Sequence, residues 1–211
     1  MGWGRRKSKA SKAKLSLDPR LPKSPAALFF QEIWSVKALG TKNLFSKTFA
    51  LEDIGELSLG WPAEVYSAYD DKALYFGFKF EVPFGSSQDR IDLFFDTKPG
   101  LSKGITRFCH QFALVSEEDT EFLEVTSFRA KEDSHEKADS KMLGWTRDKN
   151  TWSLKIPFSA LHGYEKSRLS QLGFALAITV QKKEYPLIGA STETAYSQYP
   201  GLWMGLEFLT S

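Results

Sequence analysis

The sequence predicts an all-β protein, a two-sheet antiparallel β-sandwich with jelly-roll or immunoglobulin-like layering behind a disordered basic N-terminal tail. The first observation is the aromatic content, with 6 Trp, 7 Tyr and 17 Phe among 211 residues, because aromatic side chains favour strands. The second is a series of short segments in which apolar and polar residues alternate, with no long amphipathic helix among them. The hydrophobic share of 42% and the charged share of 26% exclude wholesale disorder, collagen and coiled coil.

The N-terminal tail, residues 1–25, differs electrostatically from the rest of the chain. It holds eight basic residues against the single acidic Asp18, whereas the whole protein has a formal net charge of +2. Clustered Lys and Arg can bind nucleic acid or another anionic partner by displacing counterions, and the alternative is a solvated, disordered leader. Pro22 and Pro25 favour an extended linker, so we expect one folded domain over 26–211. The basic residues that would contact an anionic partner are Arg5, Arg6, Lys7, Lys9, Lys12 and Lys14.

Targeting and redox signals are sparse in this sequence. The N-terminal start lacks the apolar core of a secretory signal, and no stretch approaches the run of about 18 apolar residues that a membrane-spanning helix needs. We therefore expect a soluble, cytoplasmic protein with no membrane contact. The single cysteine, Cys109, can form neither an intrachain disulfide nor a cysteine-cluster zinc site.

The expected strands follow in chain order. After a short strand near 33–36 and another at 64–69, the clearest strand runs from 73 to 82, where Phe76, Phe78 and Phe80 recur on one face. The turn-like segment PFGSSQ separates it from 89–97, where apolar residues again alternate with charged ones, and we expect these two strands to pair as a hairpin. Five more strands are predicted at 107–115, 121–129, 151–156, 172–180 and 202–209.

Two further segments have a clear character. The stretch 130–141 is highly charged and has no large apolar residue, so we expect a solvated loop there. The segment SALHGY, which follows Pro157 closely and contains Gly163 as a stop signal, predicts a single helical turn. Nine strands of these lengths favour the two-sheet architecture.

The order of the strand motifs resembles a known family. YDDKALYFGFKFEV is followed by DRIDLFFDT, WSLKIPFSAL, LGFALAITV and a terminal LWMGLEF. This series is similar to the family 9 carbohydrate-binding modules and their DOMON-like relatives, and the resemblance spans roughly residues 45–209. It implies a β-sandwich that binds a ligand without transforming it, frequently a sugar and in some relatives a haem.

The chain departs from this family in two places. Members that bind sugar ends share an Asn-Asp pair after the strand that matches LGFALAITV, whereas this chain continues with Gln181 and Lys182. The haem-binding relatives use a methionine with a histidine or lysine, and the methionines here are Met1, Met142 and Met204, from which no haem pair can be assigned. We therefore expect no cofactor.

Sugar binding needs aromatic platforms and planar polar groups. Trp61 precedes a proline in a turn, Trp145 lies at the edge of the charged loop, and Trp203 lies opposite the apolar residues of its strand, so each can be partly exposed. These three are the predicted platforms. The alternative for each is that the indole packs into or against the core.

Charged residues gather on the polar side of the strand at 89–97. Arg90 and Asp92, together with Arg107 from the next strand, can hold sugar hydroxyls, and the carboxylates of Asp89, Asp92 and Asp96 can ligate calcium. The alternative is a cross-strand salt-bridge ladder of Arg90 and Arg107 with the aspartates. We favour the ladder, because arginine neutralises the charge that a cation needs, and leave metal binding open.

No catalytic motif is evident. Cys109 and His110 are adjacent, but neighbours on a strand project from opposite faces, so His110 is expected to be hydrogen-bonded and partly buried rather than paired with the thiol. No GxGxxG, P-loop, GxSxG or HExxH pattern occurs. We therefore predict a non-enzymatic protein that binds a glycan or a related small polar ligand. The alternative is a protein-interaction or structural domain whose basic tail contacts a nucleic acid or an anionic protein.

Overall fold

The computed structural model describes residues 33–50, 61–99, 104–116, 119–125, 138–165, 170–187 and 200–209, and the predicted basic tail lies outside these ranges. The described part of the chain is all-β, as predicted, and its helical elements are short 3-10 turns. None of the helices in these ranges is long and apolar enough to cross a membrane.

In the described residues, eleven strands make up a single sheet. The strands are β1 (Ile33–Ala38), β2 (Ala63–Tyr69), β3 (Ala73–Phe80), β4 (Arg90–Asp96), β5 (Cys109–Ser116), β6 (Thr120–Val125), β7 (Gly144–Asp148), β8 (Thr151–Pro157), β9 (Gln171–Val180), β10 (Lys183–Leu187) and β11 (Met204–Leu209), and the 3-10 turns are η2 (Lys47–Phe49), η5 (Ser140–Met142), η6 (Phe158–Ala160) and η8 (Pro200–Leu202).

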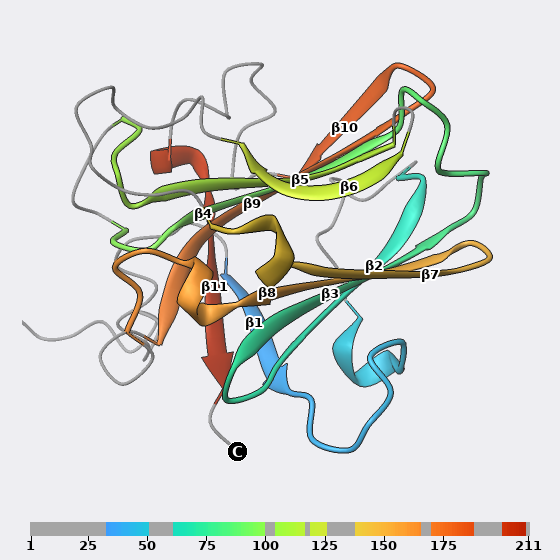
Figure 1. Cartoon of the computed structure of the whole chain (residues 1–211). Coiled ribbons are helices and arrows are strands. Elements are labelled where there is room, and N and C mark those ends of the chain that lie inside the picture. Colours follow the sequence, from blue (N-terminus) through green and yellow to red (C-terminus); the bar gives the residue numbers. More distant parts are fainter. Residues whose placement is uncertain are drawn as a thin grey trace, which may run out of the picture.

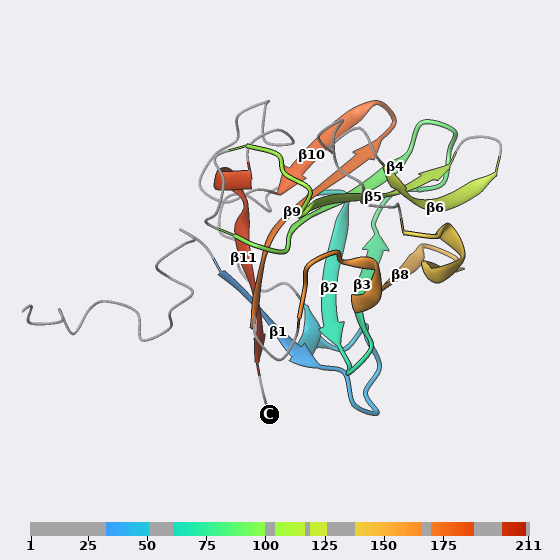
Figure 2. The ribbon, with the colours of Figure 1, turned by 60° about the vertical axis from the view of Figure 1, so that its left-hand side comes forward.

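The sheet is rolled so that its two halves face each other. Its strand order is β6-β5-β4-β9-β11-β1-β2-β3-β8-β7, with β10 paired to β9. In Figures 1 and 2 the half with β4, β5, β6 and β9 lies over the half with β2, β3, β7 and β8, and β11 and β1 join them. The prediction of two separate antiparallel sheets is therefore wrong in this respect, because β1 pairs in parallel with both β11 and β2.

The predicted hairpin between the strands at 73–82 and 89–97 is also wrong. β3 pairs with β2 and β8, whereas β4 pairs with β5 and β9, so the connecting segment crosses from one half of the sheet to the other. In that segment Phe84 is buried, with its ring centroid 4.0 Å from that of Phe80 and 5.3 Å from that of Trp152. The segment that connects β3 to β4 therefore contributes Phe84 to the core.

Two strands, β7 and β10, lack the alternating pattern by which the other nine were predicted. β7 has the sequence GWTRD and is mostly exposed, while β10 contains a proline and begins with exposed charged residues. The turn between β9 and β10 consists of Gln181 and Lys182, whose φ angles of 50° and 70° match a two-residue primed turn. Both strands are specified by pairing with a neighbour rather than by their own residues.

One smaller prediction is confirmed, and another is tested only at the end of its segment. The segment after Pro157 forms the 3-10 turn η6, and Gly163 follows it with a φ of 77°. Residues 130–137 of the predicted charged loop lie outside the described ranges, and Asp139, Ser140 and Lys141 are exposed as expected.

The main core fills the space between the two halves of the sheet. Phe76 of β3 lies at its centre, with ring centroids 5.3 Å from Phe174, 6.0 Å from Phe95 and 6.1 Å from Trp34. These four residues come from β3, β9, β4 and β1, so a single aromatic cluster connects both halves and the joining strand.

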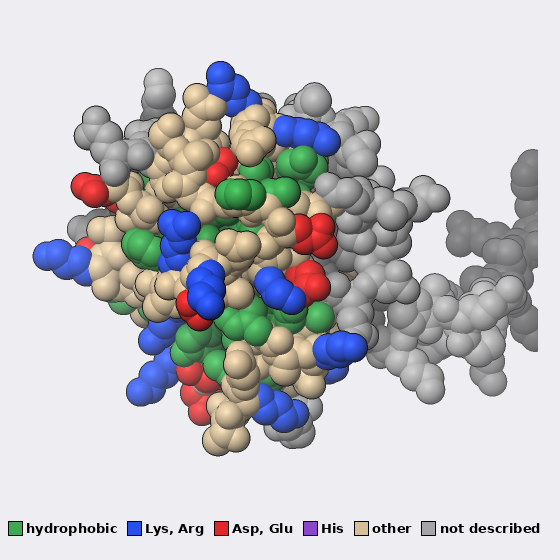
Figure 3. Space-filling view, turned by 90° about the vertical axis from the view of Figure 1, so that its right-hand side faces the viewer, with side chains coloured by type: hydrophobic (Ala, Val, Ile, Leu, Met, Phe, Trp, Pro, Cys, Tyr) green, Lys and Arg blue, Asp and Glu red, His purple; other side chains and the backbone are tan. Residues whose placement is uncertain are grey.

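Basic and acidic side chains are mixed on the end of the molecule that holds the β9–β10 and β7–β8 turns. This end faces the viewer in Figure 3, where Lys and Arg side chains are mixed with Asp and Glu, and hydrophobic side chains show between them. The face in this view therefore does not present the single-sign field that would steer a polyanion.

We expect the Phe76→Ala variant to lose about 3–5 kcal/mol of unfolding free energy, because it leaves a cavity where three aromatic rings meet. Urea denaturation of the purified chain measures this loss. The matched control is Lys79→Ala on the same strand, which removes only an exposed ion pair with Glu64 and is expected to change the free energy by less than about 1 kcal/mol. Equal effects of the two substitutions would contradict the position assigned to Phe76.

Candidate functional site

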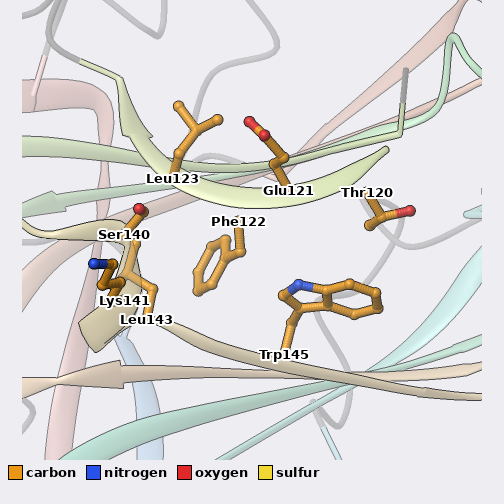
Figure 4. A pocket seen from close by; sticks show the side chains of 8 residues that line it. All are labelled: Thr120, Glu121, Phe122, Leu123, Ser140, Lys141, Leu143 and Trp145. Carbon is orange, nitrogen blue, oxygen red and sulfur yellow. The ribbon is translucent and has the colours of Figure 1, made fainter. Parts of the chain in front are cut away.

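A pocket of about 320 Å³ lies between β6 and the segment formed by η5 and β7. Within the described ranges β6 pairs with β5 and β7 pairs with β8, so the pocket lies between the first and last strands of the main strand order. We call this place the seam pocket (Figure 4). Its lining residues are Thr120, Glu121, Phe122, Leu123, Ser140, Lys141, Leu143 and Trp145.

Trp145 supplies the aromatic surface of the seam pocket. It is directly opposite Leu154 in the pairing of β7 with β8, so its side chain projects to the inner face of the sheet. Its ring packs on that of the fully buried Trp152, with centroids 5.7 Å apart and planes 23° apart. Trp145 nevertheless stays 39% exposed, so its orientation is fixed while part of its surface is open to a ligand.

The lining side chains of the pocket differ in burial and direction. Phe122 and Leu143 are buried and belong to the main core. In Figure 4 Phe122 projects from β6 toward the side where Trp145 lies, whereas Glu121 and Leu123 project to the other side of the strand, at the rim. The remaining polar groups are the hydroxyls of Thr120 and Ser140 and the ammonium of Lys141.

The position of η5 is fixed by a side-chain cap. The carboxylate of Asp139 accepts a hydrogen bond of 2.9 Å from the backbone N–H of Lys141. This cap is the reason why the charged segment before β7 forms a defined turn, and it sets Ser140 and Lys141 beside the pocket. The arrangement combines an aromatic ring with hydroxyl, carboxylate and ammonium groups, which together can bind a small polar ligand.

The structure separates the three predicted tryptophan platforms. Trp145 lines the seam pocket, whereas Trp61 lies before β2, where it is half-buried against the main core. Trp203 is only 2% exposed, so the expectation of partial exposure is wrong for this residue. The alternation correctly predicts that Trp203 lies on the face of the sheet opposite that of Leu206, the outer face. The outer face has a separate apolar cluster, in which the ring centroids of Trp203 and Phe94 are 5.9 Å apart.

Arg90 and Asp92 form an ion pair rather than a cation site. The guanidinium of Arg90 donates two hydrogen bonds, of 2.6 and 2.7 Å, to the two carboxylate oxygens of Asp92. Gln111 of β5 donates a third, of 2.6 Å, to the same carboxylate. The ion pair joins two residues of β4, whereas the predicted ladder runs between strands, and it leaves both oxygens of Asp92 occupied by donors.

The guanidinium of Arg107 packs on an aromatic ring. Its guanidinium carbon is 4.9 Å from the ring centroid of Phe108, and the ammonium of Lys98 is 4.2 Å from the same centroid. Because the ring of His162 also stacks on Phe108, basic groups surround this aromatic ring. Among the residues that the structure describes, no group of three or more His, Cys, Asp or Glu can hold a metal ion.

Cys109 and His110 project to opposite faces of β5, as predicted. Cys109 lies in the outer cluster, where burial raises the pKa of its thiol to about 11. His110 lies on the inner face, where its Nδ1 is 2.9 Å from Oε1 of Glu124 and both side chains are fully buried. Because the pKa of the Cys109 thiol is raised and His110 lies on the other face, these two residues do not form a nucleophile pair.

Most of the seam pocket could not be found in the sequence. Thr120, Glu121, Phe122 and Leu123 follow a strand pattern, and Ser140 and Lys141 read as part of a solvated loop. The signal that was available is the tryptophan beside that loop, because an indole at the border of a polar stretch is often partly exposed.

Comparisons with known proteins support the fold. No family model matches the chain, and no curated protein matches it. Among solved structures, a family 9 carbohydrate-binding module from Caldicellulosiruptor kristjanssonii in complex with cellotriose is similar at a TM-score of 0.52 and 11% sequence identity, covering 85% of this chain and 95% of that one. The same kind of module from that organism in complex with glucose has the same TM-score and identity and is covered to 97%. The chain therefore has a fold like that of family 9 carbohydrate-binding modules.

Asp89, one of the predicted cation ligands, instead ties two turns together. Its carboxylate accepts N–H hydrogen bonds of 2.8 Å from Gly85, 2.8 Å from Ser86 and 3.0 Å from Gln181. Burial alone would raise the pKa of Asp89, but these hydrogen bonds outweigh it, and the pKa lies below its usual value. The carboxylate therefore stabilises the fold in its ionised form.

We expect the Asp89→Asn variant to lose about 1–3 kcal/mol of stability at pH 7, because an amide oxygen cannot replace a carboxylate that accepts three N–H groups. Since the folded pKa is lowered, the wild-type advantage is present above the unfolded pKa of about 3.9 and is lost as the pH falls through the folded pKa. Urea denaturation from pH 7 to pH 2 measures both effects. A difference that stays constant down to the lowest pH would contradict this role, and the exposed Asp148→Asn serves as the control.

Proposed function

We propose that this protein binds a carbohydrate, without catalysis, in the seam pocket. The observation that carries the proposal is the exposed, orientationally fixed ring of Trp145 beside a pocket whose other groups include hydroxyls and two charged side chains. A pyranose has an apolar face and an edge of hydroxyl groups, so it requires an aromatic surface together with polar donors and acceptors.

The dimensions and position of the pocket support a small or terminal ligand. Its volume of about 320 Å³ is at the lower end of the range of about 300–1,000 Å³ that is usual for ligand sites. Because the pocket lies between two strands at the ends of the sheet order, backbone N–H and C=O groups on the strand edges add hydrogen-bonding capacity for sugar hydroxyls.

The structural neighbours give this proposal further support. They are carbohydrate-binding modules, one in complex with cellotriose and the other with glucose. At 11% identity the likeness is one of fold, so the ligand of this chain is proposed from its own residues.

Binding without hydrolysis fits the groups that line the pocket. Hydrolysis of a glycosidic bond ordinarily uses two carboxylates on opposite sides of the scissile bond. Of the described lining residues, Glu121 is the one with a carboxylate, and it projects to the side of β6 away from Phe122. A single rim carboxylate can accept hydrogen bonds from hydroxyls and orient a sugar.

We expect the Trp145→Ala variant to bind sugar at least about tenfold more weakly, because removing a central aromatic anchor costs about 2 kcal/mol of binding free energy. Calorimetric titration of the full chain with glucose and with cellotriose measures the change.

The matched control is Thr146→Ala, the next residue on β7, whose hydroxyl pairs with Ser153 at 2.6 Å on the other face of the strand. Its sugar affinity should equal that of the wild type. Wild-type affinity in a folded Trp145→Ala variant would place the site elsewhere. Failure of the wild type to bind any member of a broad mono- and oligosaccharide panel would contradict the proposed function.

A further inference from the structure

Glu124 makes hydrogen bonds to two separate parts of the chain. Its Oε1 is 2.9 Å from Nδ1 of His110 on β5, and its Oε2 accepts a hydrogen bond from the backbone N–H of Ala138. The side chain of Glu124 is fully buried. One carboxylate therefore joins β6, β5 and the segment that leads into η5.

These hydrogen bonds span the two walls of the seam pocket. Glu124 directly follows Leu123, which ends the β6 wall, and Ala138 precedes Ser140, which begins the opposite wall, by two residues. Ala138 is itself packed against the main core. The distance between the walls at this end of the pocket is thus set by a hydrogen bond, which has a preferred length and direction.

Burial makes the hydrogen bond from Ala138 costly to break. A buried carboxylate is unfavourable unless its oxygens accept hydrogen bonds, and losing the Ala138 N–H removes a donor from Oε2. On the other side, the ring of His110 is held parallel to that of Phe112, at 3° and a centroid distance of 5.8 Å. The contact with His110 therefore fixes the position in which the carboxylate of Glu124 accepts from Ala138.

Each wall also contributes an apolar side chain to the core. Phe122 from β6 and Leu143 from the opposite wall both belong to the main core cluster. Apolar contacts have no preferred direction and allow one surface to slide over another. The hydrogen bond from Ala138 is thus a directional link across the seam.

We infer that Glu124 is a positioning residue that fixes the separation of the two pocket walls and thereby pre-organises the seam pocket for its ligand. As a statement about ligand affinity this rests on the proposed function. As a statement about wall separation it stands on the hydrogen bonds alone. A pre-organised site binds more tightly because the ordering is complete before the ligand arrives.

Amide hydrogen exchange tests the link without any ligand. In the wild-type full chain the Ala138 amide should exchange slowly, because its N–H is bonded to a buried carboxylate. In Glu124→Leu, protection should be lost for Ala138 and for the amides of η5. Leu206→Ala is the matched control, because Leu206 is fully buried on β11, in the middle of the strand order and away from both β6 and β7. An Ala138 amide that exchanges freely in the wild type overturns the inference, whether or not the variants fold.

Sugar affinity then tests the positioning role. With glucose and cellotriose as probes, Glu124→Leu should raise the Kd by about tenfold or more, beyond any effect of Leu206→Ala at a similar loss of thermal stability. Glu124→Gln should restore affinity, because its amide oxygen can accept from Ala138 while its NH₂ group donates to Nδ1 of His110. Unchanged affinity in Glu124→Leu, with Ala138 unprotected, would overturn the positioning role. Absence of sugar binding in the wild type, with the exchange pattern as expected, would contradict only the proposed function.

Discussion

The fold depends on one strand that is bonded on both edges in the same direction. β1 runs parallel to β11 on one side and to β2 on the other, and so it joins two facing halves into a continuous sheet. Trp34 and Val36 on this strand are buried in the main core, which holds the strand in place by packing as well as by its ladders. With the halves joined at β1, the main strand order begins at β6 and ends at β7.

The seam between β6 and β7 brings together the two end strands of the main strand order. Strands at the ends of a sheet expose backbone donors and acceptors, and proteins commonly shield them with charged side chains or use them for binding. Here the two ends are bordered by Glu121 on one strand and by Arg147 and Trp145 on the other, and the carboxylate of Glu124 links them from within. A site in this position has rigid strands for its walls, which favours precise placement of a ligand.

The sequence pattern predicts which side chains share a face of a strand, but it does not predict which strands pair. Alternation correctly assigned the inner and outer faces of β3, β4 and β5, including the opposite orientations of Cys109 and His110, because side-chain direction in a strand is a local property. The partners of β3 and β4 depend on contacts far apart in the chain, so the expected hairpin between them was wrong. Local alternation also could not predict the burial of Trp203 or the pocket between residues 120–123 and 140–145, because both depend on such long-range contacts.

We propose that the seam is the ligand-binding surface of this rolled sheet. The most direct measurement is a titration of the ¹⁵N-labelled full chain with cellotriose, followed by amide chemical shifts. The account predicts that shift changes concentrate in residues 120–125 and 138–147, the two walls and their link. Changes concentrated instead around Phe108 or around Trp61, with the seam amides unaffected, would contradict it.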